Sequence, residues 1–244
     1  MQDMGPDEPY GRDFYVANAE GARRSARVVV PLILELVHPE SVVDVGCGVG
    51  AWLAVFRECG VMDIAGLDGK DLDPGLLQIP ADRFRVADLT QPLRLDRRFD
   101  LAISLEVAEH LPPECAEGFV ESLTRMAPVV MFSAAIPGQG GTHHVNERWP
   151  DYWAGLFGTR DYVALDCVRR EVWDDENVEY WYAQNTLVFV ASDRLDQYPR
   201  LRAEHGGANS RALSVVHPRK YRALMDWALG RYQDTGDYRA GGWR

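Results

Sequence analysis

The sequence predicts an α/β fold built on a mostly parallel β-sheet. Short apolar runs, typical of buried strands, alternate with segments of helical periodicity between residues 41 and 192. Strands joined through helices in this way need right-handed crossovers and lie parallel to one another. The last two apolar runs have no helical pattern between them, so these two strands are expected to pair antiparallel.

The expected elements follow one another in a regular order. Residues 10–37 carry apolar side chains at helical spacing, and Pro31 is expected to kink this helix or to split it in two. Gly60 is a stop signal for the helix before it, and Pro112 suits the first turn of a later helix. Strands are expected at residues 41–45, 63–67, 83–87, 99–105, 129–134, 162–172 and 182–191. Further helices are expected at residues 51–59, 112–126, 147–157 and 219–232, with a short helix or turn at 73–77.

Four regions are expected along the 244 residues. They are a disordered tail (1–9), a helical lid or cap (10–40), a core (41–192) and a basic helical extension (193–244). The acidic amino terminus, rich in Pro and Gly, is unlike a secretory signal or a transit peptide. Because no apolar run approaches the roughly 18 residues of a membrane span, we expect a soluble, cytoplasmic protein that has no membrane partner.

The formal net charge is −11, and it is distributed unevenly. Residues 193–244 carry ten Lys and Arg against six Asp and Glu, which leaves a charge of −15 on residues 1–192. This balance makes nucleic acid an unlikely partner in general. The cysteines show no C-x-x-C spacing, so neither a cysteine-based zinc site nor a disulfide framework is expected. They are Cys47, Cys59, Cys115 and Cys167.

The strongest motif is a glycine-rich turn between the first strand of the core and the helix after it. Gly46, Gly48 and Gly50 allow a sharp turn and a close approach of a ligand to the backbone. With Ala51 the pattern also satisfies the dinucleotide fingerprint G-x-G-x-x-A. Asp44 argues against a dinucleotide, because a carboxylate gains nothing beside a pyrophosphate. S-adenosylmethionine, which carries an ammonium and a sulfonium but no phosphate, does gain from one.

Two further acids follow at the ends of the next strands. Asp68, before Gly69, lies 24 residues past Asp44 and can accept hydrogen bonds from both ribose hydroxyls. Asp88, before Leu89, can accept from the adenine amino group. The alternative is that these carboxylates only cap or form turns.

The glycine turn, these acids, the segment Glu-Val-Ala-Glu-His-Leu at 106–111 and the antiparallel strand pair resemble the class I S-adenosylmethionine-dependent methyltransferases over residues 40–192. The resemblance implies a Rossmann-like three-layer sandwich whose seven-stranded sheet has its last strand antiparallel. It also implies that S-adenosylmethionine lies across the ends of the first four strands. The expected cofactor-binding residues are Asp44, Gly46, Cys47, Gly48, Gly50, Asp68, Gly69, Asp88, Leu89, Leu105, Glu106 and Tyr15.

Methyl transfer from a sulfonium requires a positioned nucleophile, and a hydroxyl acceptor needs a base near neutral pH. Three histidines are candidates: His110, which would share a helix face with Glu106, and the adjacent His143 and His144. His144 is the preferred base. Its segment, His-Val-Asn-Glu-x-Trp-Pro-x-Tyr-Trp, resembles methyltransferases of bacterial sugar and secondary-metabolite pathways. The alternatives are that His110 packs beneath the cofactor and that the other two lie in a solvated loop whose Asn146 caps the next helix.

Aromatic side chains are candidates for binding the acceptor. Trp149 and Trp153, four residues apart, would share a helix face, and Trp181 and Tyr10 complete the expected set. Tyr10, Phe14 and Tyr15 precede the first helix and are candidates for a lid over the cofactor. Core packing is the alternative for most of these aromatics.

No metal is expected, although Glu106, Glu109, His110 and His144 form a set that suits a divalent ion. That set is similar to the arrangement in methyltransferases of small-RNA ends, so a metal-assisted RNA 2′-O-methyltransferase stays an alternative. We expect O-methylation of a small molecule with S-adenosylmethionine as cofactor. N-methylation and a homodimer are left open. The basic residues 217–222 either contact an anionic acceptor or dock on the acidic body.

Overall fold

The computed structural model describes residues 12–69, 74–207 and 212–231, leaving out the side chains of 12–18, 206 and 207. A seven-stranded sheet has the order β3-β2-β1-β4-β5-β7-β6, and β7 runs antiparallel to both neighbours. The expected fold class is therefore confirmed. The strands are β1 (Ser41–Val45), β2 (Asp63–Asp68), β3 (Phe84–Val86), β4 (Leu101–Leu105), β5 (Val129–Ser133), β6 (Tyr162–Leu165) and β7 (Leu187–Ala191).

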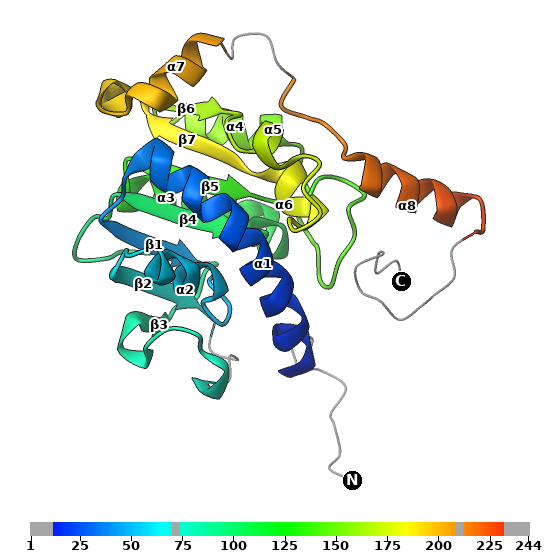
Figure 1. The fold of residues 1–244 in the computed structure, drawn as a ribbon, viewed down its shortest axis with the longest axis horizontal. Coiled ribbons are helices and arrows are strands. Elements are labelled where there is room, and N and C mark those ends of the chain that lie inside the picture. Colours follow the sequence, from blue (N-terminus) through cyan, green and yellow to red (C-terminus); the bar gives the residue numbers. More distant parts are fainter. Residues whose placement is uncertain (1–11, 70–73, 208–211, 232–244) are drawn as a thin grey trace.

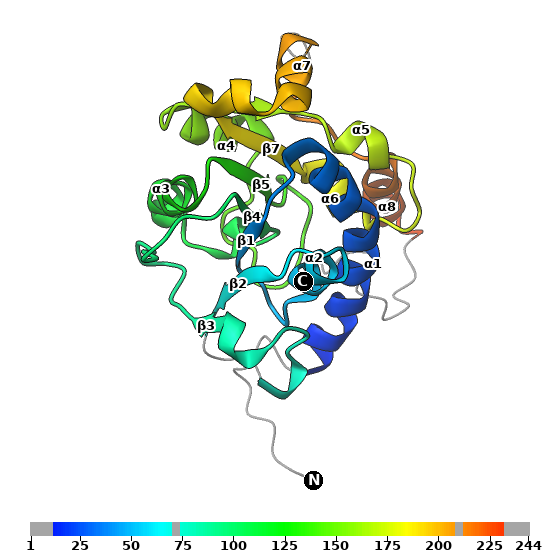
Figure 2. The same cartoon turned by 60° about the vertical axis from the view of Figure 1, so that its left-hand side comes forward.

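Helices cover both faces of the sheet, which gives three layers (Figures 1 and 2). The helices are α1 (Arg12–Val37), α2 (Ala51–Glu58), α3 (Ala116–Met126), α4 (Pro150–Gly158), α5 (Arg169–Val172), α6 (Tyr180–Asn185), α7 (Pro199–Gly207) and α8 (Pro218–Ala228). Successive strand residues point to opposite faces, so Val42 packs with α1 and α2 whereas Val43 packs with α3 and α4. Since both faces are covered, β1, β4 and β5 are almost wholly apolar and buried.

Pro31 does not split the first helix, because α1 runs unbroken through it. Pro31 and Arg27, whose carbonyl loses its helical donor, both lie on the exposed side, where water can replace the missing N–H. The opposite side of α1 presents Ala26, Val30 and Ile33 to the main core. This part of the expected cap is thus a layer of the sandwich. The expected tail (1–9) lies outside the described residues.

The chain between β6 and β7 differs from the expectation. The strand at 162–172 ends at Leu165, and the strand at 182–191 begins only at Leu187. Two short helices, α5 and α6, lie between them, so the expectation of a plain turn was wrong. Val168 and Val172, both fully buried, are four residues apart, which is helical spacing that the apolar composition concealed.

Two other expected helices also change. The helix at 147–157 begins at Pro150, so the expectation that Trp149 and Trp153 share a helix face was wrong. Asn146 does not cap α4; the N-cap is Trp149, and its side chain makes no capping hydrogen bond. The described part of the extension holds two α-helices, α7 and α8, where one was expected at 219–232. Among the described residues, no helix is long and apolar enough to cross a membrane.

Candidate active site

The glycine turn lies at the carboxyl end of β1, at the sheet edge where open α/β folds bind ligands. Gly46, Gly48 and Gly50 all have positive φ angles, of 85°, 52° and 81°. A Cβ on Gly46 would lie 2.3 Å from a methyl of Val107, and one on Gly50 would lie 2.9 Å from Ile79. A Cβ on Gly48 would meet nothing within 4 Å. Packing thus requires two of the glycines, and the third leaves open space at the tip of the turn.

Asp44 and Asp68 lie close enough beside this turn for the charge of Asp68 to act on Asp44. Oδ2 of Asp68 accepts a hydrogen bond from Gly48 N at 2.5 Å, and Oδ1 accepts one from Gly69 N at 2.7 Å. Burial raises the pKa of Asp68 against the opposing effect of these two N–H groups. Burial also raises the pKa of Asp44 well above its ordinary range, and the charge of Asp68 adds to the shift. Two neighbouring carboxyls whose pKa values burial raises favour a positively charged ligand beside them.

The remaining cofactor candidates are arranged around the same edge. Asp88 is exposed, and its Oδ1 accepts from the amide and the hydroxyl of Thr90, at 2.9 and 2.7 Å. This contact is the turn-forming role that the sequence left as an alternative, and it occupies only one carboxylate oxygen. Cys47 and Leu105 are both 8% exposed, and Leu89 is half-buried. Burial, followed by the charges of Asp44 and Asp68, raises the pKa of the Cys47 thiol.

Glu106 follows β4 with a positive φ of 55° and is tied into a network of buried amides. Its Oε2 accepts from Nε2 of Gln139 at 2.7 Å, and its Oε1 accepts from Nδ2 of Asn185 at 3.1 Å. Gln184 donates to Oε1 of Gln139 at 3.2 Å. Burial raises the pKa of Glu106, although these hydrogen bonds oppose the shift. Glu106 does not share a helix face with His110, because only 108–110 form a short 3₁₀ turn here.

The loop after β5 carries His144, whose position depends on Glu147. Nδ1 of His144 lies 2.8 Å from Oε1 of Glu147, and the N–H groups of Gly138 and Gly140 donate to the same carboxylate at 2.7 and 2.8 Å. Burial would raise the pKa of Glu147, but the hydrogen bonds from His144 and the two glycines outweigh it and lower that pKa. Gly141 lies against the other edge of the ring, since its Cβ would come within 2.3 Å of Nε2.

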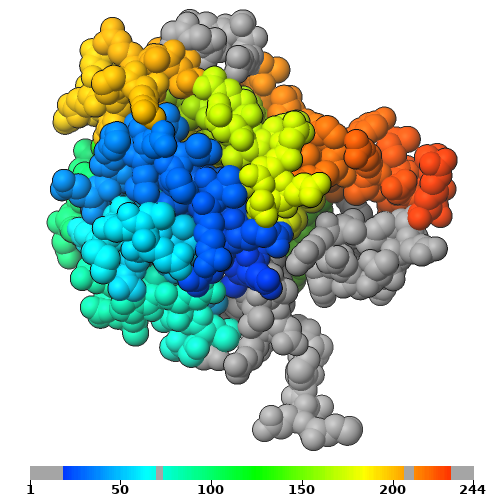
Figure 3. All heavy atoms as spheres, in the orientation of Figure 1, coloured from blue at the N-terminus to red at the C-terminus, as the bar shows by residue number. Residues whose placement is uncertain are grey.

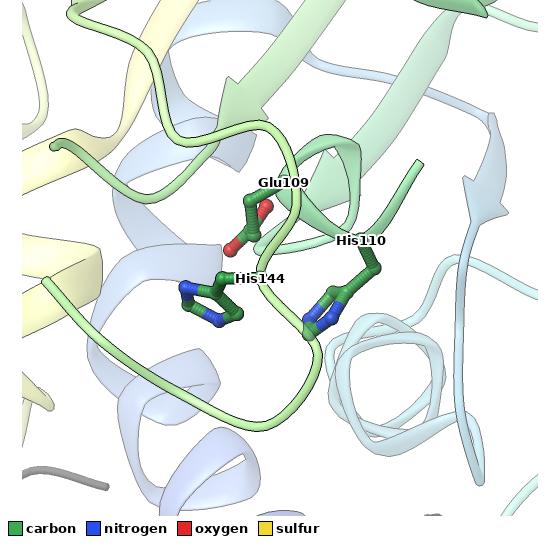
Figure 4. A group of neighbouring side chains, drawn as sticks. All are labelled: Glu109, His110 and His144. Atoms are coloured by element: carbon green, nitrogen blue, oxygen red, sulfur yellow. The ribbon is translucent and has the colours of Figure 1, made fainter. Parts of the chain in front are cut away.

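Glu109, His110 and His144 form a cluster in which one ligand atom of each lies within 4.8 Å of the others. Figure 4 shows Glu109 and His110 on the segment after β4 and His144 on the neighbouring loop. The two rings are 4.8 Å apart at 85°, and burial, followed by the charge of His144, lowers the pKa of His110 to about 4. Glu109 is fully buried, and neither carboxylate oxygen has a hydrogen-bond partner among the described residues. Its burial, together with the charge of Glu106, raises its pKa well above the ordinary range, although the nearby backbone N–H groups of Glu109 and Ala135 oppose the shift.

The structure separates the other candidates. His143 is exposed and is not part of the cluster. Trp149 is 41% exposed. Tyr152 is 37% exposed, and its ring lies beneath the guanidinium of Arg148. Trp153 is 2% exposed and packs on Phe132, so it belongs to the core and does not reach an acceptor.

Trp181 is half-buried at the edge of the main core. Tyr10 lies outside the described residues, as does the side chain of Tyr15, although the backbone of Tyr15 belongs to α1.

Sequence reasoning missed four residues of this site, namely Gln139, Glu147, Gln184 and Asn185. Lys220 was considered only as part of the basic residues 217–222, without its contact to Gln139. A signal existed for two of them, because adjacent amides in an otherwise apolar run (Gln184 and Asn185) are costly to bury without partners.

Comparisons with known proteins identify the family and support the fold. A family model described as a methyltransferase domain matches residues 18–156, more than half of the chain. The sugar N-methyltransferase KedS8 from a Streptoalloteichus species is 16% identical, with 78% of this chain and 98% of that chain covered and a TM-score of 0.56. CalS10, an amino pentose methyltransferase from Micromonospora echinaspora, is 13% identical, with 77% and 100% covered and a TM-score of 0.54.

DesVI from Streptomyces venezuelae is 24% identical over 51% of this chain, which spans 56% of that protein, with a TM-score of 0.41. No curated protein has a matching sequence. At these identities KedS8 and CalS10 show a common fold. The family match covers the glycine turn, Asp68, Asp88 and the histidine loop. The chain therefore belongs to the methyltransferase domain family and is an S-adenosylmethionine-dependent methyltransferase, as its resemblance to the class I enzymes predicted.

Proposed function

We propose that the enzyme methylates an oxygen of a small molecule, a sugar or a secondary metabolite, with His144 as the general base. The observation that carries the proposal is the contact of His144 Nδ1 with Glu147 at 2.8 Å. An imidazole whose Nδ1–H is held by a carboxylate presents a basic Nε2, and the carboxylate stabilises the imidazolium that forms. Glu147 is then a positioning residue and His144 the catalytic one.

The proposed cofactor residues lie around the carboxyl end of β1. Asp44 accepts a hydrogen bond from the ammonium of S-adenosylmethionine, and Asp68 accepts hydrogen bonds from the ribose hydroxyls. Asp88 accepts one from the adenine amino group with its second oxygen. The open space at Gly48 receives the methionine moiety. Gly46, Cys47, Gly50, Gly69, Leu89, Leu105, Glu106 and Tyr15 complete the proposed lining.

The chemical step is an in-line displacement. The acceptor hydroxyl gives its proton to Nε2 of His144 while its oxygen attacks the methyl carbon. The carbon–sulfur bond breaks, its electron pair stays on sulfur, and S-adenosylhomocysteine leaves. Because the sulfonium is already activated, most of the rate enhancement comes from alignment and from removal of the proton.

A sugar acceptor is supported by the comparisons and by the surface. KedS8 and CalS10 are described as acting on sugars, one as an N-methyltransferase and the other on an amino pentose. Trp149 and Tyr152 expose ring area close to the histidine loop, and planar rings suit the apolar face of a sugar. An amine acceptor is the alternative. Mass spectrometry and NMR of the product distinguish an O-methyl from an N-methyl group.

The test has two stages. Calorimetry with S-adenosylhomocysteine, with NADH as the control, measures cofactor binding. Turnover is then measured on a panel of nucleotide-linked sugars and aglycones. His144→Ala should lower turnover about 100-fold and leave the S-adenosylhomocysteine affinity nearly unchanged. His143→Ala is the matched control on the same loop. Unchanged turnover in His144→Ala, or a larger loss in His143→Ala, would refute the assignment.

A second candidate mechanism is metal-assisted transfer, and Glu109 favours it. A fully buried carboxylate without a hydrogen-bond partner, beside two imidazoles, fits a divalent cation. Glu109, His110 and His144 would hold the ion, whereas Glu106 is engaged by Gln139 and Asn185. A bound ion would lower the pKa of a hydroxyl that coordinates it, so that water could take the proton in place of a histidine base.

Titration with Mn²⁺ followed by calorimetry separates the two mechanisms. Binding that is lost in Glu109→Gln, together with turnover that a chelator abolishes, would favour the metal. Turnover that is insensitive to the chelator would favour the histidine base. An RNA acceptor remains disfavoured by the net charge of −11, and a labelled small RNA in the acceptor panel tests it.

A further inference from the structure

The carboxy-terminal helix α8 is attached to the body by its first turn. Lys220 is 1% exposed, but every described residue after it in the chain is half-buried or exposed, including Tyr221 at 58% and Trp227 at 54%. In Figures 1 and 3 the later turns of α8 extend away from the body beside α6. A helix that is exposed along most of its length gains little stability from packing. The buried contacts of the first turn of α8 therefore point to a role other than packing.

Lys220 is directed into the acceptor loop. Its ammonium donates to the main-chain oxygen of Gln139 at 2.5 Å. Burial lowers the pKa of Lys220 to about 8, although the charge of Glu147 opposes the shift. Burying an ammonium is costly unless acceptors surround it, and a methionine of similar length would fill the same space without that cost. The side chain therefore contributes a specific contact rather than core volume.

The N-cap of α8 reaches the same glutamine by a second route. The amide of His217 donates to Oε1 of Gln184 at 2.8 Å, and Nε2 of Gln184 donates to Oε1 of Gln139 at 3.2 Å. The His217 ring is itself held, since its Nε2 lies 2.6 Å from the Trp173 oxygen. Gln139 is thus fixed through its backbone by Lys220 and through its side chain by Gln184.

Gln139 stands between the two glycines that hold Glu147. The N–H groups of Gly138 and Gly140 both donate to the Glu147 carboxylate, which in turn holds His144. Moving the Gln139 peptide group would turn one or both glycine N–H groups away from that carboxylate. Glycines on either side give the backbone the freedom to move in this way when no contact restrains it.

We propose that Lys220 is a positioning residue, through which α8 fixes the Gln139 backbone and so keeps Glu147 and His144 in place. The expected effect of Lys220 on turnover rests on the proposed function of His144. The expected effect of Lys220 on the order of the loop does not. The extension is then part of the active site, although it lies outside residues 18–156, which the family model matches.

Hydrogen–deuterium exchange of the full chain with bound S-adenosylhomocysteine tests the loop directly, without an acceptor. Lys220→Met should speed amide exchange at 138–148 about tenfold or more, the scale of one charge-assisted hydrogen bond, and leave the strand peptides unchanged. Arg222→Met, an exposed cation on the same helix, should leave the loop unchanged. Lys220→Arg keeps a donor and should lie nearer to the wild type than Lys220→Met. If Lys220→Met is unstable, His217→Ala loosens the same turn and should give the same pattern.

A double-mutant cycle tests the link to catalysis. Lys220→Met should lower kcat about tenfold in the wild-type background and change it little in Glu147→Gln, because both act on His144. The affinity for S-adenosylhomocysteine should stay nearly constant throughout. Unchanged exchange in the loop, or additive losses in the cycle, would overturn the proposal. A failure of the proposed function alone would leave the exchange result intact, so the two failures are distinguishable.

Discussion

The placement of His144 depends on the absence of a side chain at Gly141, which makes Gly141→Ala the most direct test of the site. A Cβ on Gly141 would lie 2.3 Å from Nε2 of His144, whereas ordinary contact begins at 3.4 Å. The ring would therefore have to move by about 1 Å. The backbone of Gly141 is a poor place to absorb the clash, because its φ of 152° already disfavours a side chain.

A shift of this size breaks the contact with Glu147. The Nδ1–Oε1 distance is 2.8 Å, and about 1 Å more exceeds the range of a hydrogen bond. Misplacement of a reacting group by about 1 Å costs roughly 100-fold in rate. We expect turnover in Gly141→Ala to fall by about that factor. The affinity for S-adenosylhomocysteine should hold, since the glycine turn after β1 belongs to a different loop.

Steady-state turnover and calorimetry on the same preparations check both expectations. Gly118→Ala is the matched control, because a Cβ there meets nothing within 4 Å and the residue lies in α3. It should be neutral or slightly stabilising. Wild-type turnover in Gly141→Ala, with the His144 ring displaced in its crystal structure, would show that the position of this imidazole does not matter for catalysis.

Three further outcomes are expected. Burial, followed by the charge of Asp68, raises the pKa of Asp44 above its unfolded value, so this carboxyl destabilises the fold increasingly as the pH rises from about 4. Asp44→Asn should therefore raise the melting temperature at pH 7, but not at pH 4, while weakening S-adenosylhomocysteine binding about tenfold or more; a lower melting temperature at pH 7 would contradict this. Glu109→Gln removes an unpartnered buried carboxylate and should also raise the melting temperature in the presence of a chelator; an unchanged or lower melting temperature would contradict this. The Tyr162 hydroxyl donates to the oxygens of Thr124 and Ala127, so Tyr162→Phe should cost about 1 kcal/mol, or roughly 2–4 °C.

Most of the strands and the glycine turn could be predicted because local sequence determines them. In 41–45 the residues Val42, Val43 and Val45 are all fully buried, and a strand covered on both faces needs just such an apolar run. The glycines after it need positive φ, which no other residue adopts as readily. Asp68 ends the neighbouring strand β2, so its carboxylate could be expected beside the glycine turn.

The contacts of the loop after β5, which carries His144, could not be predicted in the same way, because they join distant parts of the chain. Gln139 is bonded to Gln184, Asn185 and Lys220, which are 45 to 81 residues away. Glu147 is close to His144 in sequence, but its role depends on backbone N–H groups, which leave no signature in side-chain type. The expected helix at 147–157 also concealed it, since a Glu in the first helical turn is unremarkable.

The edge of the sheet thus concentrates buried acids whose pKa values burial raises, namely Asp44, Glu106 and Glu109. Hydrogen bonds compensate Glu106, but neither oxygen of Glu109 has a partner among the described residues. Such an arrangement is unfavourable for the protein alone and favourable for a cationic ligand, because each unit of positive charge relieves a desolvated carboxylate. In the proposed binding mode, the sulfonium and ammonium of S-adenosylmethionine would supply that charge beside Asp44. Glu109 is the acid that this cofactor does not account for, and for that reason the distinction between a histidine base and a bound cation can be decided at this residue.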